Sequence, residues 1–483
     1  MIYYISNQPP LFKLTEDIEY KDLDFCIQYF KDIKYIGVDT ETTGFSPHSD
    51  KLLLVQLGTF TDQFVIDNSI DFTLLKPLLE DTSKVFLLHN AKFDLRFFYK
   101  LQIIPTNVYD SYLAEKLLYL GYPSGVHLNS LTACTERYLG IKLQKEIRGV
   151  IHREGNSERV IKYAAEDVKY LELVMNSQME LIKEKQLLRA LKIECNFVKV
   201  LAYIEYCGIY LDKEKWLSKM KNDNNILNQY RNQLNEWVLK NGDPNFINND
   251  RQGDLFLGFP KPTCNINWSS PQQVIELFKS LGLNLLVKDK TTGLIKNSVE
   301  ATVLLPQKDK SSIIPIYLDY KQAEKIVSTY GQSFIDAINP STGRIHSQFN
   351  QLMDTTRLSC GGEDKNTKKK YLNLQNIPSD FETRSCFISV KGSVLIDCDY
   401  TAQEDLVFTE LSREPKLIEF YNSVEKRDGH SFVAKMCFPE LLNNVPEQDV
   451  KKQFPELRAQ AKTAKFAINN IITVIDIFIY KVA

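Results

Sequence analysis

The run YIGVDTETTG, residues 35–44, constrains this chain more than any other stretch of it. A β-branched start followed by glycine is typical of a strand that leads into a turn. Side chains two residues apart in a strand point to the same face, so Asp39 and Glu41 are expected side by side. Neighbouring carboxylates repel each other unless one is protonated or a cation lies between them. The run therefore predicts a divalent metal site, with two solvated charges at a strand end as an equally weighted alternative.

Two later stretches add acidic residues to this pair. The stretch VFLLHN predicts a buried strand, and AKFDLRFF after it predicts a helix with Asn90 as N-cap and Asp94 on the first turn. Further on, YAAED predicts a helix on which Tyr163 and Asp167, four residues apart, share a face. The candidate set is then four carboxylates and one phenol: Asp39, Glu41, Asp94, Asp167 and Tyr163.

Four acids in this order, with a tyrosine four residues before the last, resemble the proofreading 3′–5′ exonucleases of the RNase H-like fold, subclass DEDDy. The resemblance covers roughly residues 20–185 and implies a mixed-sheet α/β domain over residues 1–186. It implies that the four acids hold two Mg²⁺ ions, with Mn²⁺ as an alternative, and that Tyr163 positions the attacking water. Single-stranded 3′ ends are the implied substrate, with Asn90 as a DNA contact. Asp110 is interpreted as a capping or supporting residue rather than a metal ligand.

Composition narrows the function classes. A chain of 483 residues suits two to four domains. Lys and Arg number 59 against 61 Asp and Glu, so any DNA path must come from local basic patches. The nine cysteines stand singly, without a C-x-x-C pair, which argues against zinc and for reduced thiols. With no signal peptide or membrane span recognised, a cytoplasmic location is expected, in the host cytoplasm if the chain is viral.

Beyond residue 186 the pattern changes to long helices. The sequence EYCGI from Glu205, a Ser-Pro helix start near residue 270, a Lys-Thr-x-Gly turn near residue 290 and the STY at residues 328–330 follow in order. Together they resemble the thumb of the Klenow-like family A DNA polymerases. The resemblance assigns residues 187–338 to a helical thumb, residues 339–440 to a partial palm and residues 441–483 to partial fingers.

The partial palm carries two groups of candidate residues. Arg357, Asn373 and Gln375 resemble the family's contacts to the minor groove of a DNA primer–template. The family's usual glycine before the arginine is Thr356 in this chain. The stretch VLIDCDY at residues 394–400 predicts an apolar strand and resembles motif A. By that match Asp399 ligates catalytic magnesium and Glu404 tests the incoming sugar, with Asp397 on the same strand face as the alternative ligand.

The partial fingers resemble motif B. Arg458, Lys462 and Phe466 are spaced by four, so they share one helical face, and the resemblance assigns them to a deoxynucleoside triphosphate. No motif C follows, and two-metal chemistry needs acids on both sides of the ions. The chain is therefore expected to be C-terminally truncated and to retain only exonuclease activity, unless a separate polypeptide supplies motif C. The alternatives are a stand-alone exonuclease of RNase D type, acting on DNA or RNA, and a non-catalytic nucleic-acid-binding protein.

Overall fold

The computed structural model describes residues 1–10, 15–122, 128–143, 154–242, 244–248, 262–289, 293–364, 368–423 and 427–465. The chain divides into two compact units, Met1–Val394 and Leu395–Ala483. The finer division into exonuclease, thumb, palm and fingers remains a prediction. In the described part of the chain, no helix combines the length and apolar character that crossing a membrane requires.

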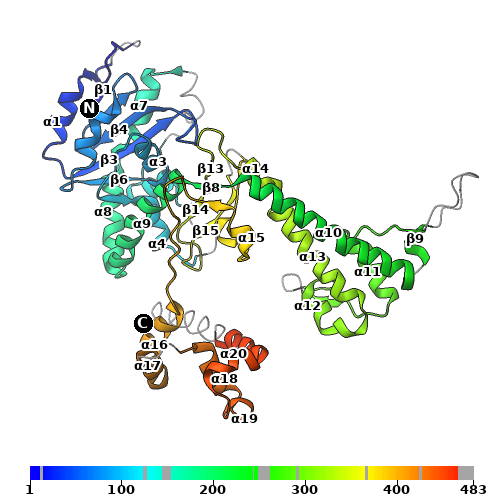
Figure 1. The fold of residues 1–483 in the computed structure, drawn as a ribbon. Coiled ribbons are helices and arrows are strands. Elements are labelled where there is room, and N and C mark those ends of the chain that lie inside the picture. Colours follow the sequence, from blue (N-terminus) through cyan, green and yellow to red (C-terminus); the bar gives the residue numbers. More distant parts are fainter. Residues whose placement is uncertain are drawn as a thin grey trace, which may run out of the picture. The chain divides into compact units, whose positions relative to one another are not determined.

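A mixed seven-stranded sheet forms the centre of the N-terminal part, as predicted (Figure 1). Its order is β2-β1-β5-β4-β3-β6-β7, with β3 antiparallel to β4 and parallel to β6. The strand that carries Asp39 and Glu41 therefore has a hydrogen-bonded neighbour on each side. The strands are β1 (Ile2–Ile5), β2 (Ile18–Lys21), β3 (Tyr35–Thr42), β4 (Leu52–Gly58), β5 (Gln63–Asp67), β6 (Val85–Leu88) and β7 (Val108–Asp110).

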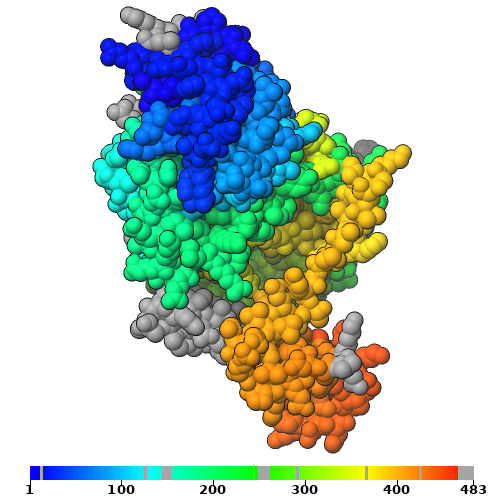
Figure 2. Space-filling model, turned by 90° about the vertical axis from the view of Figure 1, so that its left-hand side faces the viewer, coloured from blue at the N-terminus to red at the C-terminus, as the bar shows by residue number. Residues whose placement is uncertain are grey.

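Helices cover both faces of this sheet (Figure 1). Alternation along the strands divides the core: Val55 and Ile66 join the main cluster, whereas Leu54 and Val65 join a second cluster with helix α7 (Glu158–Lys169). In Figure 2 the blue residues of the sheet and the cyan to green residues of the following helices form one packed body. These helices are α1 (Leu23–Phe30), α3 (Lys92–Lys100), α4 (Ser111–Leu118), α5 (Leu131–Leu139), α8 (Leu171–Glu184) and α9 (Leu188–Cys207), with the short α2 (Lys76–Leu79) and η1 (Phe72–Leu75).

Two glycines let helix α7 approach the sheet closely. Gly37 and Gly58 are paired across β3 and β4. A Cβ atom at Gly37 would lie 2.6 Å from the carbonyl oxygen of Val168, and one at Gly58 would lie 2.7 Å from a methyl of the same residue. Only glycine at these positions leaves room for Val168. The neighbouring residue on the helix, Asp167, is thereby brought to the strand that carries Asp39.

The rest of the first unit begins with a long helical pair, α10 (Lys213–Asn241) and α13 (Ile313–Thr329). Helix α10 begins at Lys213, where Asp212 caps it by accepting a hydrogen bond from the amide of Lys215. The hydrophobic core around this helical pair includes Trp268 and Phe278. Associated elements are β8 (Ile209–Leu211), η2 (Pro244–Phe246), β9 (Ile247–Asn248), β10 (Thr263–Cys264), α11 (Pro271–Ser280), β11 (Leu286–Lys288), β12 (Ile295–Asn297), α12 (Ala301–Leu304), η3 (Leu305–Lys310) and α14 (Gln332–Asp336).

Short strands follow, and one three-stranded sheet in the order β13-β8-β18 ties them to the end of α9 through β8. Thr356, which stands where the resembled family has glycine, has a φ of 62°. A β-branched residue is strained in this left-handed region, which explains why glycine suits the position. The elements are β13 (Arg344–Ile345), β14 (Phe349–Asn350), β15 (Ser359–Cys360), β16 (Gly362–Glu363), β17 (Lys370–Tyr371), η4 (Leu374–Asn376), α15 (Phe381–Arg384) and β18 (Phe387–Ile388).

The second unit is helical in its described residues. The strand predicted at residues 394–400 does not form: the backbone there pairs with no described strand, and the side chains of Val394 and Ile396 are 79% and 81% exposed. An apolar run becomes a strand only when a neighbour satisfies its hydrogen bonds, and the described residues supply none. The helices are α16 (Gln403–Ser412), α17 (Pro415–Asn422), α18 (Gly429–Cys437), α19 (Pro439–Leu442) and α20 (Glu447–Gln453), followed by a helical stretch over residues 455–465.

Candidate exonuclease and polymerase sites

Three of the predicted acids meet at strand β3 of the sheet. Asp39, Glu41 and Asp167 each offer a carboxylate oxygen, and these oxygens all lie within 4.8 Å of one another. Strand β3 contributes the first two from one face, and the glycine-lined contact of α7 contributes the third. All three side chains are half-buried, so an ion can reach them from solvent. Hard oxygen donors packed this closely suit a divalent cation.

Asp94 lies outside this group of three. It is on the first turn of α3, as predicted, and is 2% exposed. Its Oδ1 accepts a hydrogen bond of 2.5 Å from the hydroxyl of Thr40, the residue between the two β3 acids. Burial raises the pKa of Asp94 to about 7, although the hydrogen bond from Thr40 acts in the opposite direction. The fourth acid therefore contacts β3 through Thr40.

The predicted N-cap at Asn90 is wrong. Helix α3 starts at Lys92 with Ala91 at the cap position, and Asn90 has a left-handed backbone with a φ of 69°. The carboxylate of Asp110, at the end of β7, accepts hydrogen bonds of 2.9 Å from the backbone amides of both Asn90 and Ala91. It therefore caps helix α3. Asp110 also caps its own helix α4. Its predicted capping role is thus confirmed.

Tyr163 is 5% exposed and packs in the apolar cluster under α7 with Val160 and Ala164. It stands one helical turn before Asp167, in keeping with the predicted shared face. The phenol is therefore close along the helix to one of the three gathered acids.

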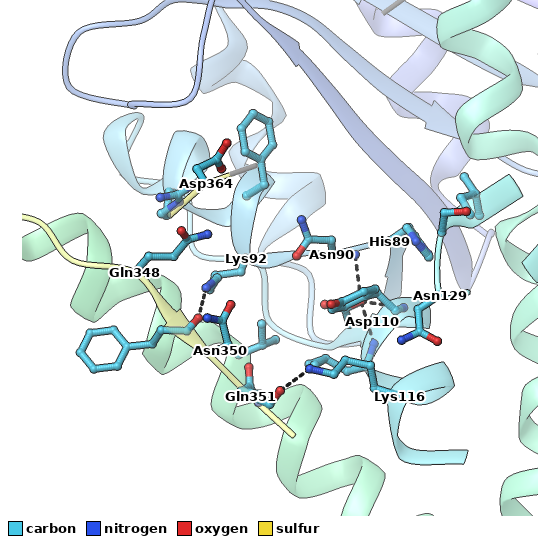
Figure 3. A pocket seen from close by; sticks show the side chains of 18 of the residues that line it. His89, Asn90, Lys92, Asp110, Lys116, Asn129, Gln348, Asn350, Gln351 and Asp364 are labelled. Atoms are coloured by element: carbon cyan, nitrogen blue, oxygen red, sulfur yellow. Dashed lines mark hydrogen bonds between the residues drawn. The ribbon is translucent and has the colours of Figure 1, made fainter. Parts of the chain in front are cut away.

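A cavity of about 770 Å³ opens beside α3 and α4 (Figure 3). One wall comes from the seven-stranded sheet and the helices that cover it, together called the sheet domain, and includes Asn90, Phe93 and Asn129. The other wall comes from the segment around β14 and includes Gln348 and Asn350. Figure 3 shows side chains from both walls around the same hollow. The cavity thus combines amide groups with aromatic rings, both of which suit a nucleic-acid strand.

The other predicted DNA contacts lie elsewhere in the first unit. Arg357, Asn373 and Gln375 are at least partly exposed. The Asn373 side chain caps η4 by accepting the amide of Gln375 at 3.0 Å. These two residues are thereby held together at the surface.

In the second unit, Asp399 and Glu404 are exposed and line a cavity of about 820 Å³. Because no strand forms at Asp397 and Asp399, the predicted alternation between them does not apply. Arg458 makes two hydrogen bonds to Asp428, of 2.7 and 3.0 Å. Burial alone would raise the pKa of Asp428, but the bonds from Arg458 and Ser431 hold it well below its usual range.

The predicted motif B face continues from Arg458 along the same helix. Lys462 is exposed one turn further on, and Phe466 lies outside the described residues. A second ion pair joins this helix to α16: Lys465 lies 2.7 Å from Asp405, with both side chains only 7% exposed. The hydroxyl of Tyr421 donates to Asp405 and accepts from Lys465.

Sequence reasoning did not identify several residues that shape these sites. Gly37 and Gly58 were a signal in principle, because glycine inside a strand often marks a close approach of another element. The bond of Thr40 to Asp94, the ion pair of Glu205 with Lys92 and the pair of Asp405 with Lys465 join distant segments, and no local pattern indicates them.

Two family models match the chain. The model described as 3′–5′ exonuclease matches residues 19–182, and the model described as DNA polymerase family A matches residues 261–471. The polymerase match thus begins after helix α10 and includes the segments predicted to be motif A and motif B. The expectation that this chain retains only the exonuclease is consequently unsupported.

Curated relatives agree with both matches. DNA polymerase I of Borreliella burgdorferi is 27% identical over 486 residues, which cover 94% of this chain and 47% of that protein. DNA polymerase I of Caldicellulosiruptor bescii is 36% identical over 208 residues, covering 42% of this chain and 22% of that protein. The chain therefore spans about half, or less, of the length of these relatives.

Among solved structures, the POL domain of Pol1 from M. smegmatis, in complex with DNA primer-template and dNTP, superposes with a TM-score of 0.69 at 22% identity. The match covers 92% of this chain and 70% of that one, which shows a shared fold. The chain is thus a member of DNA polymerase family A with a 3′–5′ exonuclease domain, homologous to DNA polymerase I across 94% of its length.

Proposed function

We propose that this chain hydrolyses the terminal phosphodiester of single-stranded DNA 3′ ends. The observation that carries the proposal is the meeting of Asp39, Glu41 and Asp167 within 4.8 Å. In this proposal the three acids hold two divalent ions, Mg²⁺ or Mn²⁺, with Asp94 as the fourth acid through Thr40. When bound, such ions supply Lewis-acid stabilisation of the phosphate and a water of lowered pKa.

The chain's own residues then perform the remaining tasks. The phenol of Tyr163, one turn from Asp167, orients the attacking water from the helix side. The cavity beside α3 receives the last nucleotides of the strand: Phe45 and Phe93, with ring centroids 6.2 Å apart, offer faces for base stacking. Asn90 and Asn350 offer amide groups to the backbone and bases from opposite walls.

The test uses a 5′-labelled single-stranded oligonucleotide and the full chain, with Mg²⁺, with Mn²⁺ and with EDTA. Asp39→Ala is expected to lower the rate of 3′ degradation by roughly a thousandfold or more, because the ions lose a ligand on which they depend. Its circular dichroism spectrum should stay unchanged. Undiminished degradation by Asp39→Ala, or degradation that survives EDTA, excludes this function.

A second candidate function is template-directed DNA synthesis, favoured by the family match over residues 261–471. Asp399 would ligate catalytic magnesium, Glu404 would test the sugar, and Arg458, Lys462 and Phe466 would hold the triphosphate. Arg357, Asn373 and Gln375 would contact the primer–template. A phosphate group can take the place of Asp428 on Arg458, since both present paired oxygens to a guanidinium.

Primer extension by the chain, with and without an added polypeptide that carries a polymerase motif C, tests this candidate. Extension that Asp399→Ala abolishes supports it. Extension that Asp399→Ala leaves intact excludes the assigned role of Asp399.

A further inference from the structure

Glu205, near the end of helix α9, is a deeply buried acid with 1% of its side chain exposed. It lies behind the cavity beside α3 and α4, because it contacts three of the lining residues, Lys92, Arg96 and Phe349. One carboxylate oxygen lies 2.7 Å from Nζ of Lys92, and the other lies 3.3 Å from the guanidinium of Arg96. Both cations belong to helix α3, which also carries Asp94. Burying a carboxylate is unfavourable unless charge partners compensate it, so this acid ties α9 firmly to α3.

The same carboxylate also holds the other wall of the cavity. It accepts the backbone amide of Phe349, on strand β14, at 2.7 Å. Lys92 completes the ring, because its Nζ donates to the carbonyl oxygen of Phe349 (Figure 3). Both backbone polar groups of Phe349 are therefore satisfied by Glu205 and its partner Lys92.

A nearby residue in the same wall is held in a similar way. The backbone carbonyl of Gln351 accepts a hydrogen bond of 2.5 Å from Nζ of Lys116 (Figure 3). The side-chain amide of Gln351 donates a hydrogen bond of 2.7 Å to the carboxylate of Glu194. Lys116 belongs to α4 and Glu194 to α9, so charged side chains dock the segment from Gln348 to Gln351 on the sheet domain. Glu205 differs from these two charges in that its one carboxylate contacts both α3 and β14, and so joins one cavity wall directly to the other.

We propose that Glu205 is a positioning residue that sets the spacing of the two cavity walls and thereby the affinity for a single-stranded 3′ end. It acts through Lys92, Arg96 and Phe349, and it does not enter the hydrolysis step. The inference rests on the proposed exonuclease function for the identity of the strand. Beyond that function, we infer that the segment from Gln348 to Gln351 forms part of the exonuclease substrate site and that the buried acid Glu205 holds it there.

The experiment compares Glu205→Gln with the matched control Glu115→Gln in the full chain. Glu115 is equally buried, at 0% exposure, and its carboxylate binds Arg137, Tyr138 and Gln178, all of which belong to the sheet domain rather than to the β14 wall. Binding of a fluorescent five-nucleotide oligo-dT is measured by anisotropy in EDTA, and KM and kcat for its degradation are measured in Mg²⁺.

Glu205→Gln is expected to raise Kd and KM at least tenfold with kcat within about twofold, whereas Glu115→Gln changes each by less than twofold. Glu205→Asp keeps the charge with a shorter reach, so it should fold and raise Kd about threefold or more. Unchanged Kd in both Glu205 variants, a fall in kcat at constant KM, or an equal effect of Glu115→Gln overturns the inference. If the wild-type chain binds the oligonucleotide but does not degrade it, the proposed exonuclease function is excluded, whereas the positioning role of Glu205 is still supported by the change in Kd.

Discussion

The two places where we propose acids for metal chemistry differ in how their carboxylates are held. Asp39 and Glu41 lie on a strand with a hydrogen-bonded neighbour on each side, under a helix that delivers Asp167. Asp399 lies on an exposed segment that forms no strand among the described residues. The same kind of apolar run precedes both sites. The difference teaches that a strand-like sequence places a carboxylate only where partner strands and a covering helix are present.

The largest expected effect sharpens this contrast directly. Asp167→Asn removes one charge from the assembled acids and should lower 3′ degradation by about a thousandfold, because the ions lose a ligand. Asp399→Asn, the matched change in the second unit, should leave degradation within about twofold. Initial rates on a labelled single strand measure both. Equal losses in the two variants would break the comparison, since degradation would then depend on both units.

The second unit is expected to depend on its own buried pair. Lys465→Met removes the cation of this pair from Asp405, whose side chain is 7% exposed, and loss of one partner of a buried ion pair costs about 3–5 kcal/mol of folding free energy. The double variant Asp405→Asn/Lys465→Met should recover much of the lost folding free energy, because neither charge of the pair then remains buried. Urea unfolding followed by limited proteolysis of residues 395–465 reports the effect. A single variant as stable as wild type would show that the pair is solvated.

A smaller effect tests how closely α7 must approach β3. Gly37→Ala places a Cβ 2.6 Å from the backbone oxygen of Val168, so the helix must shift and carry Asp167 with it. A displacement of about 1 Å at a catalytic group can cost roughly a hundredfold in rate. Gly58→Ala is the control, because the atom nearest its new Cβ is a side-chain methyl of Val168, and its loss should be milder. Degradation rates rank the two; the reverse order would contradict the packing explanation.

The smallest expected effect concerns acid sensitivity in the first unit. His346 bonds the carbonyl of Glu205 and packs on His48, with ring centroids 4.3 Å apart. Burial first, and then the charges of His48 and Arg344, lower the pKa of His346 to about 4. The folded state therefore favours the neutral ring. The stability it contributes is present above about pH 6.5 and is lost as the pH falls through about 4.

His346→Gln should accordingly flatten the fall of the urea midpoint between pH 6.5 and pH 4.5. Some slope should remain, because burial also lowers the pKa of His48 and of His430 in the second unit. A variant curve parallel to that of the wild type across this range would show that His346 does not titrate with folding.

The sequence alone determined the α/β character of the N-terminal part, the helical character of the middle and the set of candidate acids from which the three at β3 come. These follow from local periodicity and from motif order, since alternation in YIGVDTET is enough to put Asp39 and Glu41 on one face. The capping role of Asp110 was likewise predictable, because an acid just before a helical stretch has an obvious backbone partner.

Only the tertiary structure decided which acids meet and what holds the cavity. Asp94 pairs with Thr40 across 54 residues, and Glu205 reaches Lys92 across 113 residues and Phe349 across 144. It also decided that residues 394–400 form no strand, because strand formation depends on neighbours that a local pattern does not contain. Side-chain period is a property of a segment, whereas hydrogen-bond and charge partners are a property of the whole fold.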